Sequence, residues 1–101
     1  MPAEVIDNRE ESRYEIRLEG ELAGFAEYRL EDGQISFTHT EIAERFGGKG
    51  LGTELIAYAV ADAQTRQLSI LPFCSFVRAY IAERPELVEL VPAERREQFG
   101  L

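Results

Sequence analysis

The chain changes its hydrophobic period at a glycine-rich loop, GGKGLG at residues 47–52, and this change limits the folds that it can adopt. Before the loop, apolar and charged residues alternate. In RYEIRLE at 13–19, Tyr14, Ile16 and Leu18 are expected to be buried and the charged residues between them exposed to water. A period of two is typical of a strand with one buried face. After the loop the apolar residues recur at helical spacing, which predicts a helix.

Residues before the loop are expected to form a meander of antiparallel strands. The alternating pattern predicts strands at 13–19, 22–30 and 35–40, and a further strand in EVID near the start. Gly24 marks a bulge in the second of these strands. Asp32-Gly33 predicts a hairpin turn, because these residues adopt positive φ angles at little cost.

Residues after the loop are expected to form a helix, a short strand and a second helix. The first helix is predicted from about Gly50 to Arg66. Its buried face is expected to consist of Leu51, Leu55, Ile56, Ala59, Val60 and Ala63. LSIL at 68–71 is typical of a buried strand that Pro72 ends. The second helix is predicted to begin near Ser75 and to stop at Pro85. Its inward residues are expected to be Phe76, Val77, Tyr80 and Ile81. ELVELV predicts a short turn or helix, and PAERREQFGL a weak helix.

The strand–helix–strand order predicts a right-handed crossover between two parallel strands. The strands that end near Thr40 and near Leu71 therefore have their carboxyl ends at the same edge of the sheet. The glycine loop leaves the first of these ends, and Cys74 follows the second. In open α/β sheets, ligands bind at this edge.

Composition excludes several classes of partner. At 101 residues the chain is expected to be one domain spanning 1–101. Its net charge of −8 argues against a nucleic-acid partner and leaves room for a cationic substrate. No run approaches the ~20 apolar residues of a membrane span. A single cysteine cannot form an internal disulfide. The lack of a Cys/His cluster argues against a zinc site. The charged N-terminal stretch MPAEVIDNRE favours a cytoplasmic protein over a secreted one.

The glycine loop is a candidate anion site, because it follows a strand and opens a helix. The first amides of a helix lack internal partners and carry partial positive charge. No Ser, Thr, Asp or Asn stands where it would cap them, and Lys49 adds a positive charge. The spacing fits neither a P-loop nor a dinucleotide fingerprint. The alternative is a glycine-rich turn that only tightens the packing of strand against helix.

Cys74 and His39 are candidate catalytic residues at the same sheet edge. Cys74 lies at the start of a helix, where a thiolate is stabilised, although its helical spacing with Val77 and Ile81 also fits a core position. His39 is the only histidine and is a candidate base or proton carrier, or else a structural residue at the sheet edge. A Cys74–His39 pair is topologically feasible. Glu41 is a second candidate base.

Two long stretches resemble the small GNAT-like N-acetyltransferase family. They are FTHTEIAERFGGKGLGTELIAYAV at 37–60 and LPFCSFVRAYIAERPELVELV at 71–91. The resemblance implies a mixed α/β domain with a GNAT-like acyl-CoA N-acyltransferase fold. In that fold an antiparallel meander precedes a β-α-β unit and C-terminal helices. The sequence departs from the family's HPEY pattern at Arg84 and Leu87, which replace His and Tyr.

The resemblance also implies an acetyl-CoA site. GNAT proteins bind the CoA pyrophosphate with a [Q/R]-x-x-G-x-[G/A] loop, whose glycines Gly50 and Gly52 match, while Gly47 stands where Gln or Arg is usual. The other residues that the resemblance places near the cosubstrate are Gly48, Lys49 and Leu51 in the loop, Ile42 beside the pantetheine arm, Phe73, Ser75 and Phe76 near the thioester, and Arg78 near a phosphate.

Two chemical routes follow from this placement. Cys74 takes the acetyl group and passes it on, or an amine attacks acetyl-CoA directly with help from His39 or Glu41. The sequence therefore predicts an acetyl-CoA-dependent N-acetyltransferase without a metal. Its acceptor is a primary amine, on a small molecule or a protein lysine. The alternatives are a CoA- or acyl-CoA-binding module with little or no transferase activity, and a structural or protein-interaction domain that keeps the loop for packing. The acceptor and the oligomeric state are not readable from the sequence.

Overall fold

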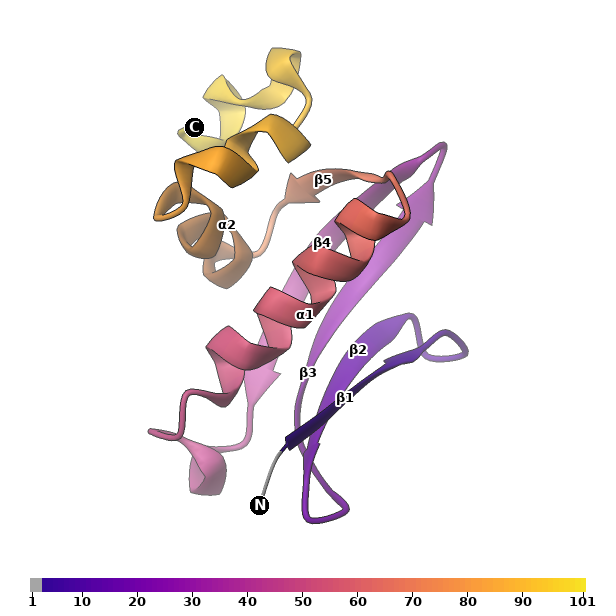
Figure 1. Cartoon of the computed structure of the whole chain (residues 1–101), viewed down its shortest axis with the longest axis vertical. Coiled ribbons are helices and arrows are strands. Elements are labelled where there is room, and N and C mark those ends of the chain that lie inside the picture. Colours follow the sequence, from indigo (N-terminus) through magenta and orange to yellow (C-terminus); the bar gives the residue numbers. More distant parts are fainter. Residues whose placement is uncertain (1–2) are drawn as a thin grey trace.

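A five-stranded mixed sheet, covered on one face by two helices, forms the body of the protein (Figure 1). The computed structural model describes residues 3–101. Met1 and Pro2, which begin the charged N-terminal stretch, lie outside the described residues. The strands are β1 (Ala3–Asn8), β2 (Arg13–Leu18), β3 (Glu21–Glu31), β4 (Gln34–Ile42) and β5 (Ser69–Pro72). The α-helices are α1 (Leu51–Thr65) and α2 (Ser75–Ala82). The 3-10 turns are η1 (Glu44–Phe46), η2 (Pro85–Leu90), η3 (Ala93–Arg95) and η4 (Glu97–Phe99).

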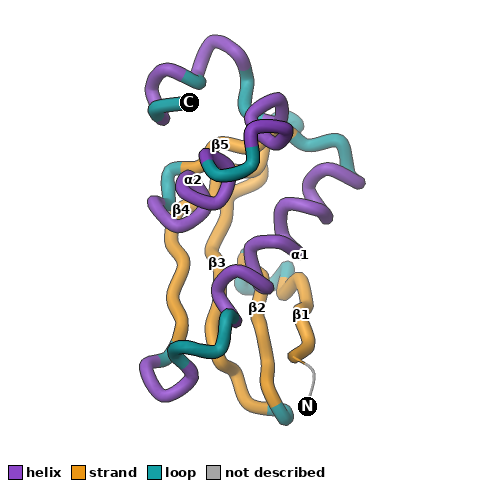
Figure 2. Tube along the Cα trace, turned by 60° about the vertical axis from the view of Figure 1, so that its left-hand side comes forward, coloured by secondary structure: helices purple, strands orange, loops and turns teal. Residues whose placement is uncertain are grey.

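The strands follow one another across the sheet in chain order. Neighbours from β1 to β4 are antiparallel, and β5 runs parallel to β4, as the crossover rule predicts. α1 lies along the sheet between these two strands in the chain (Figures 1 and 2). The α/β fold class expected from the sequence is confirmed, and the short EVID segment is indeed part of β1.

The predicted turn and bulge of β3 are both present. Asp32 and Gly33 have φ angles of 49° and 76°, the positive pair that a tight hairpin needs. The β2–β3 register passes over Ala23, next to Gly24. A Cβ on Gly24 would lie 2.5 Å from the Glu41 carbonyl oxygen. The close approach of β4 therefore requires glycine at this position of β3.

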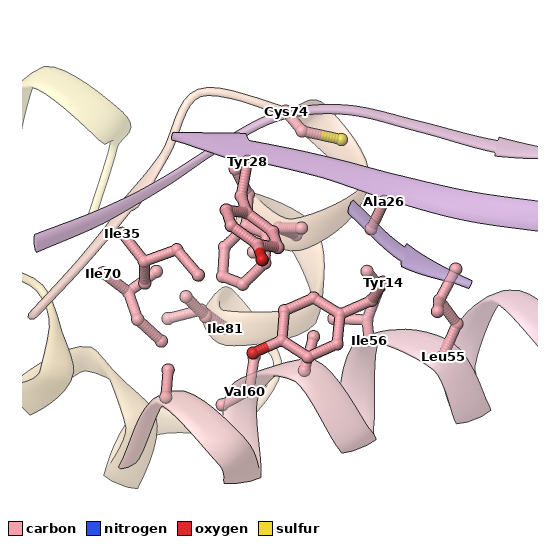
Figure 3. Packing of buried hydrophobic residues seen from close by; sticks show 14 of the residues in the cluster. Tyr14, Ala26, Tyr28, Ile35, Leu55, Ile56, Val60, Ile70, Cys74 and Ile81 are labelled. Atoms are coloured by element: carbon pink, nitrogen blue, oxygen red, sulfur yellow. The ribbon is translucent and has the colours of Figure 1, made fainter. Parts of the chain in front are cut away.

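The main core lies between the sheet and the helices. All six residues of the predicted face of α1 are buried, which confirms that face. Figure 3 shows Ile56 and Val60 of this helix packed toward Tyr14 of β2. Ile70 of β5 and Ile81 of α2 extend the same core. No helix among residues 3–101 is long and apolar enough to cross a membrane.

The prediction that every charged residue of β2 is exposed is wrong for Glu15. Its side chain is 1% exposed, on the face of the sheet opposite α1. Asn8, Arg13 and Arg17 donate hydrogen bonds of 3.0, 2.8 and 2.9 Å to its carboxylate. Burial by itself raises the pKa of this carboxyl, but the bonds from Arg17, Asn8 and Arg13 outweigh it and hold the pKa below its ordinary value. Neighbouring side chains therefore bury this carboxylate as an ion-paired group.

The Glu15 carboxylate is expected to make stability depend on acidity. Because its pKa is lower in the folded state, its stabilising effect is complete above the unfolded pKa near 4.5 and is lost as the pH falls through the folded value. Glu15→Gln should lower the free energy of unfolding by about 1–2 kcal/mol at neutral pH. In urea unfolding the gap between the two proteins should narrow below about pH 4. An equal gap at both pH values would contradict this account.

The C-terminal quarter differs from its prediction in two respects. Phe76 is 39% exposed and Tyr80 is half-buried, so only Val77 and Ile81 of the four expected inward residues of α2 are fully buried. Phe76 turns toward the first turn of α1 instead, since Gly52 leaves room there. PAERREQFGL forms the turns η3 and η4 in place of a continuous helix, and ELVELV lies mostly in η2.

Candidate functional site

β4 and the edge strand β5 separate partway along β4. Their parallel pairing runs from Gln34 opposite Ser69 to Phe37 opposite Pro72. One further link follows, in which the Cys74 N–H donates to the Phe37 carbonyl oxygen at 2.8 Å. β4 then continues to Ile42 without β5 beside it. Beyond Phe37, the side of β4 that faced β5 therefore has no neighbouring strand. We call this opening, at the carboxyl ends of the two parallel strands, the gap.

A bulge at Thr38 sets which backbone groups face this gap. Tyr28 of β3 pairs with Phe37 and Glu27 with His39, so Thr38 has no partner in the register. Beyond the bulge, the Ala43 N–H donates to the Ala23 carbonyl oxygen at 2.8 Å.

Backbone groups that face the same neighbouring strand recur at every second residue of an antiparallel pair. The peptide groups of His39 and Glu41 therefore point to β3. Those of Thr40 and Ile42 point into the gap, where the described residues provide no partner strand.

The glycine loop follows the carboxyl end of β4, at the open end of the gap. Gly48 and Gly50 have φ angles of +78° and +74° with nothing within 4 Å of the Cβ position, so the loop backbone is open to approach. Gly50 is the N-cap of α1 and no side chain caps it, as the sequence predicts. The Glu54 N–H donates to the Gly50 carbonyl oxygen, which leaves the amides of residues 51–53 without partners inside the helix.

Gly47, which stands where Gln or Arg is usual, ends the turn that leads the chain out of β4. Its N–H donates to the Glu44 carbonyl oxygen at 3.0 Å and closes the turn η1. A Cβ on Gly47 would lie 3.2 Å from that same oxygen, a tight contact with backbone. A side chain here would press against the turn that leads the chain out of β4.

Cys74 borders the gap on the helix side of the sheet. It is the N-cap of α2, its side chain is 8% exposed, and Figure 3 shows it at the margin of the core. The Cys74 thiol donates to the Thr40 hydroxyl oxygen, with 3.1 Å between sulfur and oxygen. Its burial fits the core alternative from the sequence, and its reactivity stays a prediction.

The hypothesis of a Cys74–His39 pair is wrong in this structure. Successive side chains of a strand point to opposite faces, and Thr40 is the residue that contacts Cys74. His39 and Glu41 therefore leave the other face of the sheet. There the His39 Nε2 lies 3.5 Å from a Glu41 carboxylate oxygen, and its ring centroid lies 6.2 Å from that of Phe25. His39 is 56% exposed on the face away from the helices.

Two of the remaining sequence candidates lie together at the start of α1. Phe76 lies over the first turn of α1, and half-buried Ile42 lies close by. A cavity of about 210 Å³ opens beside Phe76, between α1 and α2. Its lining consists of Thr53, Phe76, Ala79, Tyr80, Glu83 and Arg84.

The other candidates lie outside that cavity. Ser75 and Lys49 are exposed, and Arg78 is half-buried. Phe73 is 44% exposed and packs edge-on against Phe99, with 5.2 Å between the ring centroids. The structure thus brings Ile42, Phe76 and the loop together and directs Phe73 elsewhere.

Three residues of the site region were not among the functional candidates from the sequence. Thr40 contacts the thiol, Thr38 forms the bulge, and Arg84 stacks on Tyr80 with its guanidinium carbon 3.8 Å from the ring centroid. The polar run Thr38–Thr40 that follows Phe37 in β4 was the available signal for the two threonines. Among residues 3–101 no group of three or more His, Cys, Asp or Glu side chains could hold a metal ion.

Comparisons with known proteins agree with this architecture. The solution structure of a GCN5-like candidate N-acetyltransferase from Staphylococcus aureus superposes with a TM-score of 0.67 and 23% sequence identity. The match covers 88% of this chain and 87% of that one, and at this identity it shows a shared fold. No curated protein matches the sequence. Residues 13–90 match the GCN5-related N-acetyl-transferase family. The chain therefore belongs to the GCN5-related N-acetyltransferase family, as an N-acetyltransferase whose acceptor is unknown.

Proposed function

We propose that the protein binds acetyl-CoA in the gap between β4 and β5 and transfers its acetyl group to a primary amine. The observation that carries the proposal is the row of backbone groups on β4 at Thr40 and Ile42, which face the gap without a partner strand. Unpaired strand edges bind extended chains with amide groups, because N–H and C=O groups then pair as in a sheet. The pantetheine arm of CoA is such a chain.

The loop supports the same ligand at its other end. The partnerless amides of residues 51–53 and the open backbone at Gly48 and Gly50 form a site suited to a pyrophosphate. Exposed Lys49 adds positive charge in an otherwise acidic protein. The cavity beside Phe76 offers Arg84 and the Tyr80 ring to the remainder of the nucleotide. These residues therefore support binding of the pyrophosphate and of the pantetheine arm of CoA.

The two faces of β4 suggest a division of roles. Bound acetyl-CoA supplies an acetyl group activated as a thioester. His39 is the proposed base, because it is exposed on the face away from the helices and has room for an incoming amine. The Glu41 carboxylate, 3.5 Å from the His39 Nε2, would orient the imidazole toward the amine. The proposed acceptor approaches from this face.

Cys74 is proposed to act from the helix side of the gap. Its thiol contacts the Thr40 hydroxyl, and no base of the described chain touches it. A nucleophilic cysteine needs an activating partner, so the geometry favours direct transfer over a covalent relay. In the direct route the thiol lies on the side from which it can give a proton to the departing sulfur.

Binding of acetyl-CoA is tested by calorimetry with a matched pair of glycine variants. Gly50→Ala and Gly100→Ala both introduce a Cβ at nearly the same positive φ, +74° and +73°, with open space around it. Only Gly50 lies at the start of α1. Gly50→Ala is therefore expected to weaken acetyl-CoA binding at least about tenfold, the effect of losing hydrogen bonds to a charged group. Gly100→Ala should bind as the wild type does.

Two outcomes would contradict the proposal. Absence of binding heat at millimolar acetyl-CoA would show that acetyl-CoA is not the cosubstrate, and the glycine loop would then serve only the packing of strand against helix. Binding without release of CoA in the presence of any primary amine, whether small or a peptide lysine, would favour the CoA-binding module instead.

A further inference from the structure

A second hollow lies on the face of the sheet away from α1. It has a volume of about 460 Å³ and spans β3, β4, β5 and η3. Its floor includes Ser36 and Thr38, which alternate with the buried residues Ile35 and Phe37 of β4. The proposed acetyl-CoA site does not include this hollow, which we call the open-face groove.

The open-face groove carries two arginines in a protein with a net charge of −8. Arg29 lines it from β3, and Arg95 from η3 on the β5 side. Within residues 3–101, neither arginine is part of an ion pair, although most carboxylate side chains of these residues are exposed. Both guanidinium groups are therefore without a carboxylate within 4 Å among residues 3–101, although Glu31 lines the same groove.

Arg95 is held in place by its neighbours. Its Nε donates to the Gln98 side-chain oxygen at 2.7 Å, which leaves both terminal nitrogens for another partner. The guanidinium carbon lies 6.0 Å from the Phe73 ring centroid and 5.9 Å from that of Phe99. A guanidinium fixed in this way presents the paired N–H groups that bind a carboxylate.

The groove leads from the hairpin to the gap. Glu31 lies at the hairpin end, beside Gln34 in the register, and Thr38 and Phe73 lie at the other end. Thr38 and Phe73 immediately precede His39 and Cys74 in the chain. The groove thus reaches the position where the pairing of β4 with β5 ends, on the same face of the sheet as His39.

We propose that the open-face groove binds the acetyl acceptor, and that this acceptor is a small amine that also carries a carboxylate, as an amino acid does. The inference rests on the proposed function. The carboxylate lies between Arg29 and Arg95, and Glu31 repels it from the hairpin end. The amine then lies at the Thr38 end, next to the gap, and Leu71 and Phe73 contact the apolar part of the acceptor.

The transfer balances with the groups named. The amine nitrogen forms a bond to the acetyl carbon as the bond from that carbon to the CoA sulfur breaks. The sulfur leaves with the electron pair, the amine proton passes to His39, and a proton from Cys74 or solvent neutralises the thiolate. The products are an N-acetylated carboxylate and CoA.

The test is an NMR titration of the isotopically labelled protein saturated with CoA, using L-leucine and L-leucinamide as probes. L-leucine should shift the amide resonances of Ser36, Thr38 and Leu71. L-leucinamide lacks the carboxylate, so the dissociation constant obtained from the same resonances should be at least about tenfold higher. Arg95→Gln should weaken L-leucine binding about tenfold, and Arg95→Lys should restore part of it. Arg9→Gln, at an exposed arginine beside Asp7, is the matched control and should bind as the wild type does.

Each result bears on the inference separately from acetyl-CoA binding. Equal shifts with L-leucine and L-leucinamide, or unchanged L-leucine binding in both Arg95→Gln and Arg29→Gln, would overturn it. Shifts confined to the glycine loop would overturn it as well. The amide resonances of the glycine loop report CoA binding in the same sample. If CoA does not shift them, the proposed function fails, and this result is distinct from a failure of the groove to bind L-leucine.

Discussion

Replacing Gly24 by alanine is expected to lower the free energy of unfolding by about 3 kcal/mol, the upper part of the range for overpacking in a core. The added Cβ would lie 2.4 Å from the Ile42 side chain and 2.5 Å from the Glu41 carbonyl oxygen. The second contact is with backbone, so β3 and β4 must move apart for the methyl group to fit. In a domain of this size the melting temperature should fall by more than about 10 °C.

The control is Gly20→Ala, in the turn between β2 and β3. Its φ is +82° and nothing lies within 4 Å of its Cβ position, so the methyl group adds backbone strain without a collision. It should cost only about 1–2 kcal/mol. If thermal unfolding shows equal losses for the two variants, close approach of β4 is not what requires glycine at residue 24.

Replacing His39 by glutamine is expected to lower kcat about 100-fold, the lower end of the usual contribution of a general base. The dissociation constant for acetyl-CoA should stay unchanged, because His39 leaves the face of β4 opposite Cys74 and is 56% exposed. Stability should change little for the same reason. Steady-state kinetics with a reactive amine and calorimetry with acetyl-CoA measure the two quantities separately.

Two further variants separate direct transfer from the covalent relay. Glu41→Gln should have a smaller effect than His39→Gln, since its carboxylate only contacts the imidazole. Cys74→Ala should retain measurable transfer, and mass spectrometry should find no acetyl group on the wild-type thiol. A full loss of activity in Cys74→Ala, with an acetylated Cys74 in the wild type and an unaffected His39→Gln, would establish the relay instead.

The sequence predicted much of the fold because its elements are amphipathic and local. α1 is recovered with its complete buried face, since apolar residues at helical spacing bury the same stripe in any surrounding core. The hairpin at Asp32-Gly33 follows from backbone preferences that act within a few residues. Parallel pairing of β4 with β5 follows from the handedness of crossovers.

The wrong predictions involve residues whose surroundings come from distant segments. Glu15 alternates like an exposed residue, but Asn8 and two arginines cover it. Phe76 has an inward helical position, yet the space that it fills is made by Gly52 in another helix. Periodicity reports which face of an element a residue occupies and carries no information about what lies against that face.

The sequence by itself determined the order of the elements, the uncapped glycine loop at the start of α1 and the family to which the chain belongs. Only the tertiary structure decided how the candidate catalytic residues are distributed. The bulge at Thr38 directs Thr40 toward Cys74 and His39 to the opposite face. The physical reason is that a bulge depends on the register of two paired strands, and one extra residue in that register exchanges the faces of every side chain that follows.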